Sequence, residues 1–204
     1  MSTPIADTAV ASDDGRAKRN VAVLVFAQAI LGSQLAINII VAGFAGEVLA
    51  PSASLATLPI SIVVVGSLLT APAMSLYMGR YGRRAGFWLS TLAAALASAL
   101  CARALFVGSF ALFLAGSVFL GVFQATQGFF RFAATDTASD AFKPKAISWV
   151  LAGGLLSALL GPQIADVASG AISTVPYARA YIAMIPLHVA GAVGLTFLDI
   201  PTPR

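Results

Sequence analysis

Charged residues are scarce in this chain of 204 residues: Lys, Arg, Asp and Glu together make up 10% of it, whereas hydrophobic residues make up 59%. A soluble domain carries about 25% charged residues, and a water-soluble fold of this length could not bury so much apolar surface. The mean hydropathy of +0.91 agrees with this conclusion. The composition therefore predicts an integral membrane protein and excludes an ordinary soluble domain.

Cysteine and histidine are almost absent, with one residue of each. Cys101 has no second cysteine with which to form a disulfide or a metal site. The apolar runs also lack the pairs of histidines or carboxylates that a haem or metal site would need, so we expect no cofactor and no metal. None of the serines has the Gly-x-Ser-Gly setting of an intramembrane serine protease, and we do not expect an enzyme.

The net charge of +4 does not indicate a nucleic-acid partner. A groove for single-stranded nucleic acid interleaves basic residues with exposed aromatics, and this chain does not. The first twenty residues carry three aspartates ahead of a basic cluster, and the apolar run after them is too long for a signal peptide. We expect residues 1–20 to form a disordered cytoplasmic tail.

Six apolar runs are long enough to cross a bilayer, which takes about 20 residues. The short connections between them make sequence neighbours antiparallel. The expected fold is an all-α bundle of six transmembrane helices over residues 21–199, followed at 200–204 by the start of a linker or a C-terminal tail. The predicted spans are Val21–Phe44, Leu55–Met78, Phe87–Leu105, Phe110–Phe130, Ala146–Val167 and Tyr177–Leu198.

Basic residues lie almost entirely on one side of this topology. With the N-terminus in the cytoplasm, ten Lys and Arg residues fall on the cytoplasmic side, and only Arg103 and Arg179 fall on the other. Cytoplasmic loops carry an excess of Lys and Arg. The asymmetry therefore predicts that both termini lie in the cytoplasm and that the protein resides in the cytoplasmic (inner) membrane.

Polar side chains within the predicted spans form two sets. Gln34 and Asn38 are four residues apart in the first helix and share a face, whereas Gln124, Gln127 and Arg131 form one stripe along the fourth. Such side chains are costly in lipid and tend to face the bundle interior or a cavity. The stripe that ends at Arg131 indicates the lining of a cavity, and the alternative for each amide is hydrogen bonding between helices.

Two titratable residues are candidates for proton coupling. Asp166 follows a Gly-Pro pair in the fifth helix, and His188 lies in the sixth helix near small residues. A titratable imidazole can relay protons. The alternatives are a solvated loop acid for Asp166 and a hydrogen-bonded packing role for His188, which is favoured for the histidine.

A basic turn separates the second and third predicted helices. Residues 75–84 have the sequence Ser-Leu-Tyr-Met-Gly-Arg-Tyr-Gly-Arg-Arg. This resembles the loop signature Gly-x-x-x-Asp-Arg-x-Gly-Arg-Arg of the major facilitator superfamily, with Ser75 in place of the glycine and Gly79 in place of the aspartate. The matching positions are Arg80, Gly82, Arg83 and Arg84.

The fifth helix carries a second resemblance. Small residues there follow the spacing of Gly-x8-Gly-x3-Gly-Pro-x2-Gly, a signature of proton-linked exporters in the same superfamily, and Gly161 and Pro162 match it by identity. We expect Ser157 and Gly161 to allow close helix packing and Pro162 to bend the helix. The pattern slightly favours export.

The resemblance implies that the chain is the N-terminal six-helix half of a secondary transporter, with substrate held between two halves. It implies alternating access, in which the basic turn acts as a conformational latch. The first and fourth helices would line the substrate path with their polar residues, which are Gln34, Asn38, Gln124, Gln127 and Arg131. The implied partners are the lipid bilayer, a small solute and a second six-helix half. That half is either a continuation of this chain, another copy of it or a different polypeptide.

Gly79 lacks the carboxylate that the loop signature supplies to the latch. We therefore expect Arg131 either to pair with Asp136 or Asp140 or to meet the substrate. The alternative to transport is a non-transporting membrane scaffold, a regulatory subunit or an inactive truncated fragment.

Overall fold

Six long helices make up most of the computed structural model, which describes residues 5–170, 175 and 177–201. Each helix has a stretch long and apolar enough to span a membrane, and the described residues contain no strand. The predicted all-α bundle with six membrane-length helices is therefore confirmed. The helices are α1 (Ile5–Leu49), α2 (Leu58–Tyr81), α3 (Arg83–Val107), α4 (Phe110–Gln127), α6 (Lys143–Gly170) and α7 (Ala178–Thr196), with a short α5 (Phe130–Ala133) and a 3-10 turn (Ala53–Leu55).

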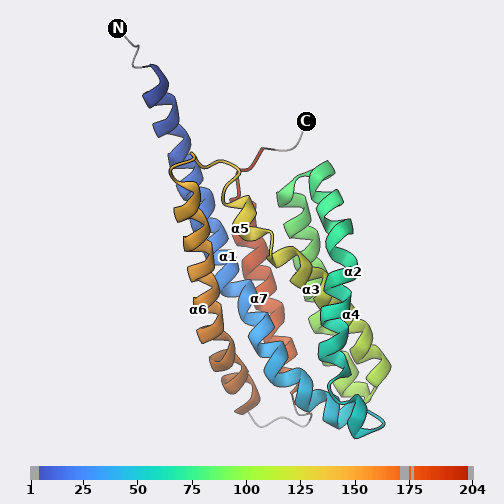
Figure 1. The fold of residues 1–204 in the computed structure, drawn as a ribbon. Helices are drawn as coiled ribbons and strands as arrows, with labels where there is room; N and C mark the ends of the chain where they lie inside the picture. Colours follow the sequence, from blue (N-terminus) through green and yellow to red (C-terminus); the bar gives the residue numbers. More distant parts are fainter. Residues whose placement is uncertain (1–4, 171–174, 176, 202–204) are drawn as a thin grey trace.

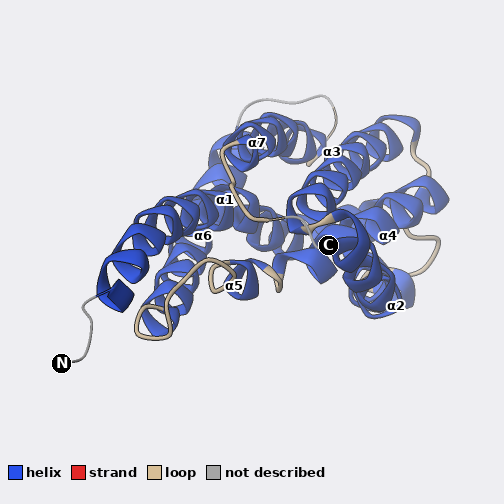
Figure 2. Ribbon diagram, turned by 90° about the horizontal axis from the view of Figure 1, so that it is seen from above, coloured by secondary structure: helices blue, strands red, loops and turns tan. Residues whose placement is uncertain are grey.

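The helices pack as two groups of three, seen end-on in Figure 2. In one group α1 packs against α6 and α7, and in the other α4 packs against α2 and α3, while α3 and α7 join the groups. The start of α1, the α2–α3 turn and the segment after α7 lie at the same end of the bundle (Figure 1). We call this the basic end, because it carries the Lys and Arg residues of α1, of that turn and of the start of α6.

A single residue, Gly82, connects α2 to α3. Its φ of 88° lies in a region that side chains disfavour, and its N–H donates to the carbonyl of Met78 at 2.9 Å. The next turn needs a second glycine, because a Cβ on Gly86 would lie 2.3 Å from the Met78 side chain. The basic turn is therefore a tight reversal with little freedom of backbone conformation.

Glycines also set the closest approaches between helices. A Cβ on Gly121 of α4 would lie 2.7 Å from the carbonyl oxygen of Val63 in α2, and one on Gly153 of α6 would lie 2.8 Å from the carbonyl oxygen of Val25 in α1. Helix association in lipid depends on such close packing, because lipid tails remove the hydrophobic drive between helices. In each group of three, one helix pair is thus in close backbone contact, α2 with α4 and α1 with α6.

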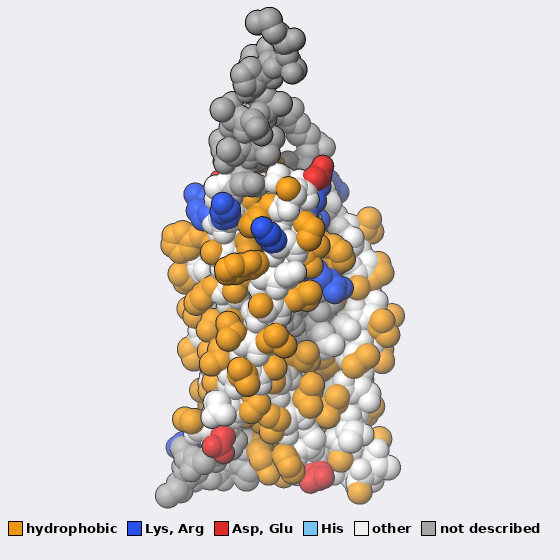
Figure 3. Space-filling model, turned by 60° about the vertical axis from the view of Figure 1, so that its left-hand side comes forward, with side chains coloured by type: hydrophobic (Ala, Val, Ile, Leu, Met, Phe, Trp, Pro, Cys, Tyr) orange, Lys and Arg blue, Asp and Glu red, His pale blue; other side chains and the backbone are white. Residues whose placement is uncertain are grey.

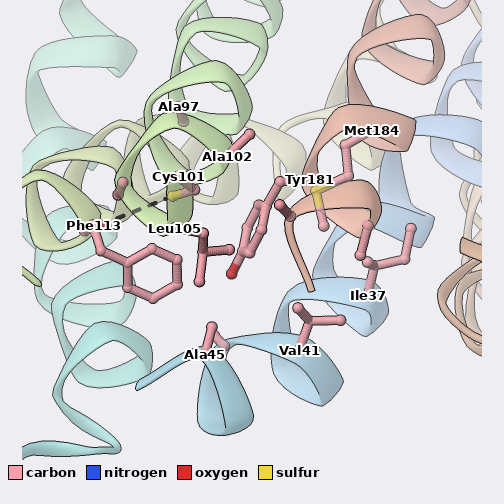
Figure 4. Packing of buried hydrophobic residues seen from close by; sticks show 14 of the residues in the cluster. Ile37, Val41, Ala45, Ala97, Cys101, Ala102, Leu105, Phe113, Tyr181 and Met184 are labelled. Atoms are coloured by element: carbon pink, nitrogen blue, oxygen red, sulfur yellow. Dashed lines mark hydrogen bonds between the residues drawn. The ribbon is translucent and has the colours of Figure 1, made fainter. Parts of the chain in front are cut away.

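The core at the end opposite the basic end is built around Tyr181 of α7, which is fully buried (Figure 4). Its ring meets Phe113 of α4 edge-on, with centroids 5.5 Å apart. Cys101, the single cysteine, is buried in the same cluster and approaches the carbonyl of Phe113. This cluster joins α1, α3, α4 and α7 on the side away from the basic turn.

The first helix begins at Ile5, well before the predicted start at Val21. Its 45 residues span roughly 68 Å, more than twice the hydrocarbon thickness of a bilayer. Ala17 and Asn20 are fully buried, so residues 15–20 form packed helix where a disordered tail was expected. The physical reason is a tertiary partner, described below, that pairs with this turn. Residues 1–4 and 202–204, parts of the predicted tail and linker, lie outside the described residues.

The fourth span also differs from the prediction. The helix expected over 110–130 ends at Gln127, and a turn at Gly128 and Phe129 leads into the separate α5. Glycine is a poor helix former, which agrees with the break at Gly128. Arg131 therefore lies on α5 and not on α4.

Candidate functional site

A hollow of about 450 Å³ opens between α1, α4 and α6. This volume lies within the range of about 300–1,000 Å³ typical of small-molecule sites. The hollow is open on one side and not enclosed. Its polar lining comes from Gln28 of α1, Gln124 and Gln127 of α4, Arg131 of α5 and Ser157 of α6.

The three helices converge at Gly32 of α1. A Cβ there would lie 2.8 Å from both the Gln127 Nε2 and the Ser157 Oγ. Because Gly32 has no side chain, the Gln127 amide of α4 and the Ser157 hydroxyl of α6 both lie against the backbone of α1 at this residue. The Ser157 hydroxyl donates to the carbonyl of Gly154, 2.7 Å away, within its own helix.

Gln124 gives the hollow an unsatisfied acceptor. Its Oε1 is buried and has no hydrogen-bond partner among the described residues. Buried polar groups in native proteins are almost always hydrogen-bonded, so such an exception calls for an explanation, such as backbone strain, a bound water or a functional role. Arg131 adds a cation on the same side, with its guanidinium 5.1 Å from the ring centroid of Phe132. The hollow thus brings the Gln124 amide and the Arg131 side chain into one polar lining.

Gln34 and Asn38 lie away from the hollow, against α7. The His188 Nε2 and the Gln34 Oε1 are hydrogen-bonded, and the Tyr181 hydroxyl donates to the Asn38 Oδ1 at 3.2 Å. All four side chains are buried. With 3.6 residues per turn, the face of α1 that carries Gln34 and Asn38 points away from the hollow. We call these two pairs the α1–α7 seam.

The predicted path residues are therefore divided between two regions. Gln124, Gln127 and Arg131 line the hollow together, whereas Gln34 and Asn38 belong to the seam. Gln28, one turn before Gly32, takes their place as the polar contribution of α1. Sequence spacing carries this signal, because Gln28, Gly32 and Ala36 repeat every four residues along the face that meets α6.

The packing residues of α6 face α1. A Cβ on Gly161 would lie 2.5 Å from the Cβ of Ala36 and 2.9 Å from the carbonyl oxygen of Ser33. Pro162 lies within the helix and has no N–H to donate to the carbonyl of Ala158, a residue that lines the hollow. The two candidates for proton coupling lie apart, because Asp166 is exposed on α6 while His188 is buried in the seam.

An ion pair at the basic end supplies the carboxylate that Gly79 lacks. Arg83, the first residue of α3, donates to both carboxylate oxygens of Asp136 in the segment after α5; the Nη2 to Oδ1 distance is 3.2 Å. The pair lines a pocket of about 360 Å³ together with Gly79 and Met78. The basic turn is thus connected to the helix end that carries Arg131.

The expected pairing of Arg131 with Asp136 or Asp140 does not match the structure. Asp136 pairs with Arg83, and Asp140 accepts from Lys143 at 2.7 Å. Lys143 holds the pKa of Asp140 below its usual value through this hydrogen bond. Both acids thus have a nearer cation, and Arg131 faces the hollow.

A second cluster at the basic end was not expected from the sequence. Arg16 and Arg19 of α1 each contact the carboxylate of Asp199 at 2.8 Å. The Asn20 side chain donates to the Asp199 carbonyl at 2.7 Å and accepts from its N–H at 2.9 Å. This cluster attaches the segment after α7 to the start of α1. The only sequence signal was a lone acid after the last apolar run.

Comparison with known proteins relates the chain to transporters. It is 33% identical over 193 residues to the riboflavin transporter RfnT of Brucella anthropi, an alignment that covers 95% of this chain and 48% of that protein. It is 27% identical over 149 residues to YddS of Bacillus subtilis, an uncharacterized MFS-type transporter, covering 73% of this chain and 34% of that protein. No protein-family model matches the chain.

The fold is that of an integral membrane protein: six membrane-length helices, with an open polar hollow lined by α1, α4, α5 and α6. Both similar proteins are named as transporters, one of them of the MFS type, in agreement with the resemblance at the basic turn. It spans about half the length of the riboflavin transporter and about a third of the length of YddS.

Proposed function

We propose that this chain forms the N-terminal six-helix half of a secondary active transporter that moves a small solute across the cytoplasmic membrane by alternating access. Both termini lie in the cytoplasm in this proposal, because the ten-to-two distribution of basic residues favours that orientation. The observation that carries the proposal is the unsatisfied Gln124 acceptor in an open hollow that also holds Gln127 and Arg131.

Riboflavin is the first candidate solute. The support is the 33% identity to a protein named as a riboflavin transporter. The flavin imide and the ribityl hydroxyls are donors suited to the Gln124 Oε1, and the flavin carbonyls are acceptors suited to Arg131. The hollow supplies one wall of the binding site, and a second six-helix half supplies the facing wall.

The central experiment measures riboflavin flux into proteoliposomes that contain the complete assembly. Losing a hydrogen bond to a charged group costs about 1.5–3 kcal/mol, so we expect Arg131→Gln to weaken riboflavin binding by about tenfold to a hundredfold. Arg103→Gln is the matched control, because Arg103 is exposed on α3 away from the hollow. Saturable flux that is equal in both variants would contradict the assigned site.

The assembly itself is tested by its mass in mild detergent. A transporter built from halves predicts a complex that contains two six-helix units. A stable monomer of this chain that binds nothing on a panel of solutes would favour the scaffold or the inactive fragment.

Protons are the proposed coupling ion, and the fifth-helix pattern slightly favours export. Asp166→Asn and His188→Gln are tested by solute flux under an imposed pH gradient. We expect one of them to abolish the response to the gradient while leaving passive exchange intact. If both variants respond as the wild type does, neither residue carries the proton.

A further inference from the structure

An apolar groove of about 590 Å³ lies on the outer side of the α1–α6 contact. On α6 its lining residues are Lys145, Trp149 and Leu156, which the helical period places on the face opposite the hollow-lining Leu151 and Gly154. The groove and the hollow therefore lie on opposite sides of the same helix pair, and ligands of the two sites do not compete for space.

A second apolar groove, of about 560 Å³, runs between α1 and α7. The two grooves share Ala22 and Phe26, and the Phe26 side chain is 46% exposed between them. We call these two grooves together the double groove. Its two apolar channels lie on either side of Phe26 on α1.

The first groove extends through about one leaflet of a bilayer. It runs from Lys18 to Ala29 along α1 and from Lys145 to Leu156 along α6. At 1.5 Å per residue each run is about 16 Å long, and half of the hydrocarbon core is about 15 Å. Its length therefore matches that of an acyl chain that enters from the basic end.

Two lysines lie where a phospholipid headgroup would sit. The neighbouring cations are paired, since Arg16 and Arg19 contact Asp199 and Lys143 contacts Asp140. The lysines of the groove are exposed, and they form no ion pair with any side chain that the structure describes.

Trp149 lies one turn below Lys145 and is 62% exposed. Tryptophan in this position is typical of the membrane interface. Figure 3 shows the side of α6, with Lys and Arg gathered at the upper end above a broad hydrophobic surface. The groove thus combines cations at the headgroup level with an aromatic side chain at the interface and apolar walls below.

We propose that the double groove binds one diacyl phospholipid with an anionic headgroup. The ammonium groups of Lys18 and Lys145 hold the phosphate, and the two acyl chains lie on either side of Phe26. Basic side chains next to a membrane surface attract anionic lipids. The proposal depends on the outer face alone and stands whether or not the hollow carries riboflavin.

The test is native mass spectrometry of the full-length protein, with any partner chain it carries, titrated with phosphatidylglycerol or phosphatidylcholine. One lysine near an anionic surface contributes about fivefold in affinity. We expect Lys18→Gln/Lys145→Gln to weaken phosphatidylglycerol binding by about thirtyfold and to leave phosphatidylcholine unchanged. Lys143→Gln is the matched control, because that lysine lies between the groove residues Phe142 and Lys145 without lining the groove itself, and it pairs with Asp140.

A second variant tests the apolar part without touching the charges. Ala22 is exposed at the junction of the two grooves, so Ala22→Trp fills the space of the acyl chains. We expect it to abolish phosphatidylglycerol binding, whereas Ala99→Trp, at an exposed alanine of α3, retains it. Equal binding of the two lipids, equal loss in the Lys143→Gln control, or full binding by Ala22→Trp would each overturn the proposal. The last result would point to another occupant, such as a protein helix.

Discussion

The first helix presents polar side chains to two neighbours, and the two sets differ in how their hydrogen bonds are made. Toward α7, Gln34 and Asn38 are each bonded to a buried side chain. Toward α4 and α6, Gln28 lines an open hollow in which the Oε1 of Gln124 lacks a partner within the described residues. Similar amides thus occupy a closed seam on one face and an open site on the other.

This difference separates polar residues that hold the bundle together from those available to a ligand. A buried amide with a partner contributes to stability, and removing that partner is costly. A buried polar atom without one is a cost, and each region has one among the described residues: the Gln124 Oε1 in the hollow and the His188 Nδ1 in the seam. Breaking a hydrogen bond that the seam makes and removing the unpartnered oxygen of the hollow should therefore change stability in opposite directions.

The largest effect is expected at the α1–α6 contact beside the hollow. A Leu side chain at Gly161 would meet Ala36 and the backbone of Ser33 and push α6 away from α1. Overpacking costs about 1–3 kcal/mol and sometimes more, so we expect Gly161→Leu to destabilise the protein by about 3 kcal/mol and to lose transport. The measurement is the unfolding midpoint in mild detergent.

Gly43 of α1 provides the matched control, because a Cβ there would have nothing within 4 Å. Gly43→Leu makes the same chemical change in open space and should leave the midpoint within about 0.5 kcal/mol of the wild type. Equal destabilisation by the two variants would show that the α1–α6 contact is not the cause.

Breaking the seam should have the next largest effect. His188→Leu leaves the Gln34 oxygen without its partner, and an unsatisfied buried group costs about 1–3 kcal/mol. The double variant Gln34→Leu/His188→Leu removes both polar groups and should recover part of the loss. A double-mutant cycle from unfolding midpoints measures the coupling. If the stability losses of the two single variants simply add in the double variant, the Gln34–His188 hydrogen bond does not contribute to stability.

A smaller effect of the opposite sign is expected in the hollow. Gln124→Leu removes the unpaired oxygen, so stability should stay the same or rise by up to about 1 kcal/mol. Riboflavin binding should weaken by about threefold to tenfold, because one neutral hydrogen bond is lost. Unfolding midpoints and fluorescence titration with riboflavin measure the two effects. A loss of stability as large as that of His188→Leu would remove the distinction between the two regions.

The sequence was sufficient to predict the fold class, because each membrane span is recognisable from its length and hydropathy. It also grouped Gln34 with Asn38 and Gln124 with Gln127, since these depend only on the helical period. The sequence could not show which neighbouring helix each polar face contacts. Gln34 contacts His188, 154 residues away in the sequence, and no local pattern distinguishes that partner from a cavity.

The boundaries failed for a similar reason. The start of α1 looked like a polar tail because it carries acidic and basic residues and few of the apolar residues that mark a membrane span. Asp199, 183 residues beyond Arg16, supplies that partner. The carboxylate for the basic turn was likewise invisible locally, since Asp136 lies 53 residues from Arg83. In both places the partner is distant in the sequence, so local composition could not predict the contact.

The smallest stability effect is expected at the basic turn, where a polar pair is made but is partly exposed. The side chains of Arg83 and Asp136 are 28% and 25% exposed, and such pairs contribute up to about 1 kcal/mol. We expect Asp136→Asn to lower stability by about 0.5 kcal/mol. If the pair is a latch, its loss should nevertheless change the rate of solute exchange, because the pair joins the α2–α3 turn to the helix end beside the hollow.

Asp140→Asn is the control for this last prediction, since it removes a carboxylate from the same connection whose partner, Lys143, belongs to α6 and not to the turn. It should change neither stability nor exchange rate. The charge exchange Arg83→Asp/Asp136→Arg should restore the rate if the pair acts by attraction alone. A stability loss above about 2 kcal/mol for Asp136→Asn would show that the Arg83–Asp136 pair is a structural element like the seam. An unchanged rate of solute exchange would show that the pair is not a latch.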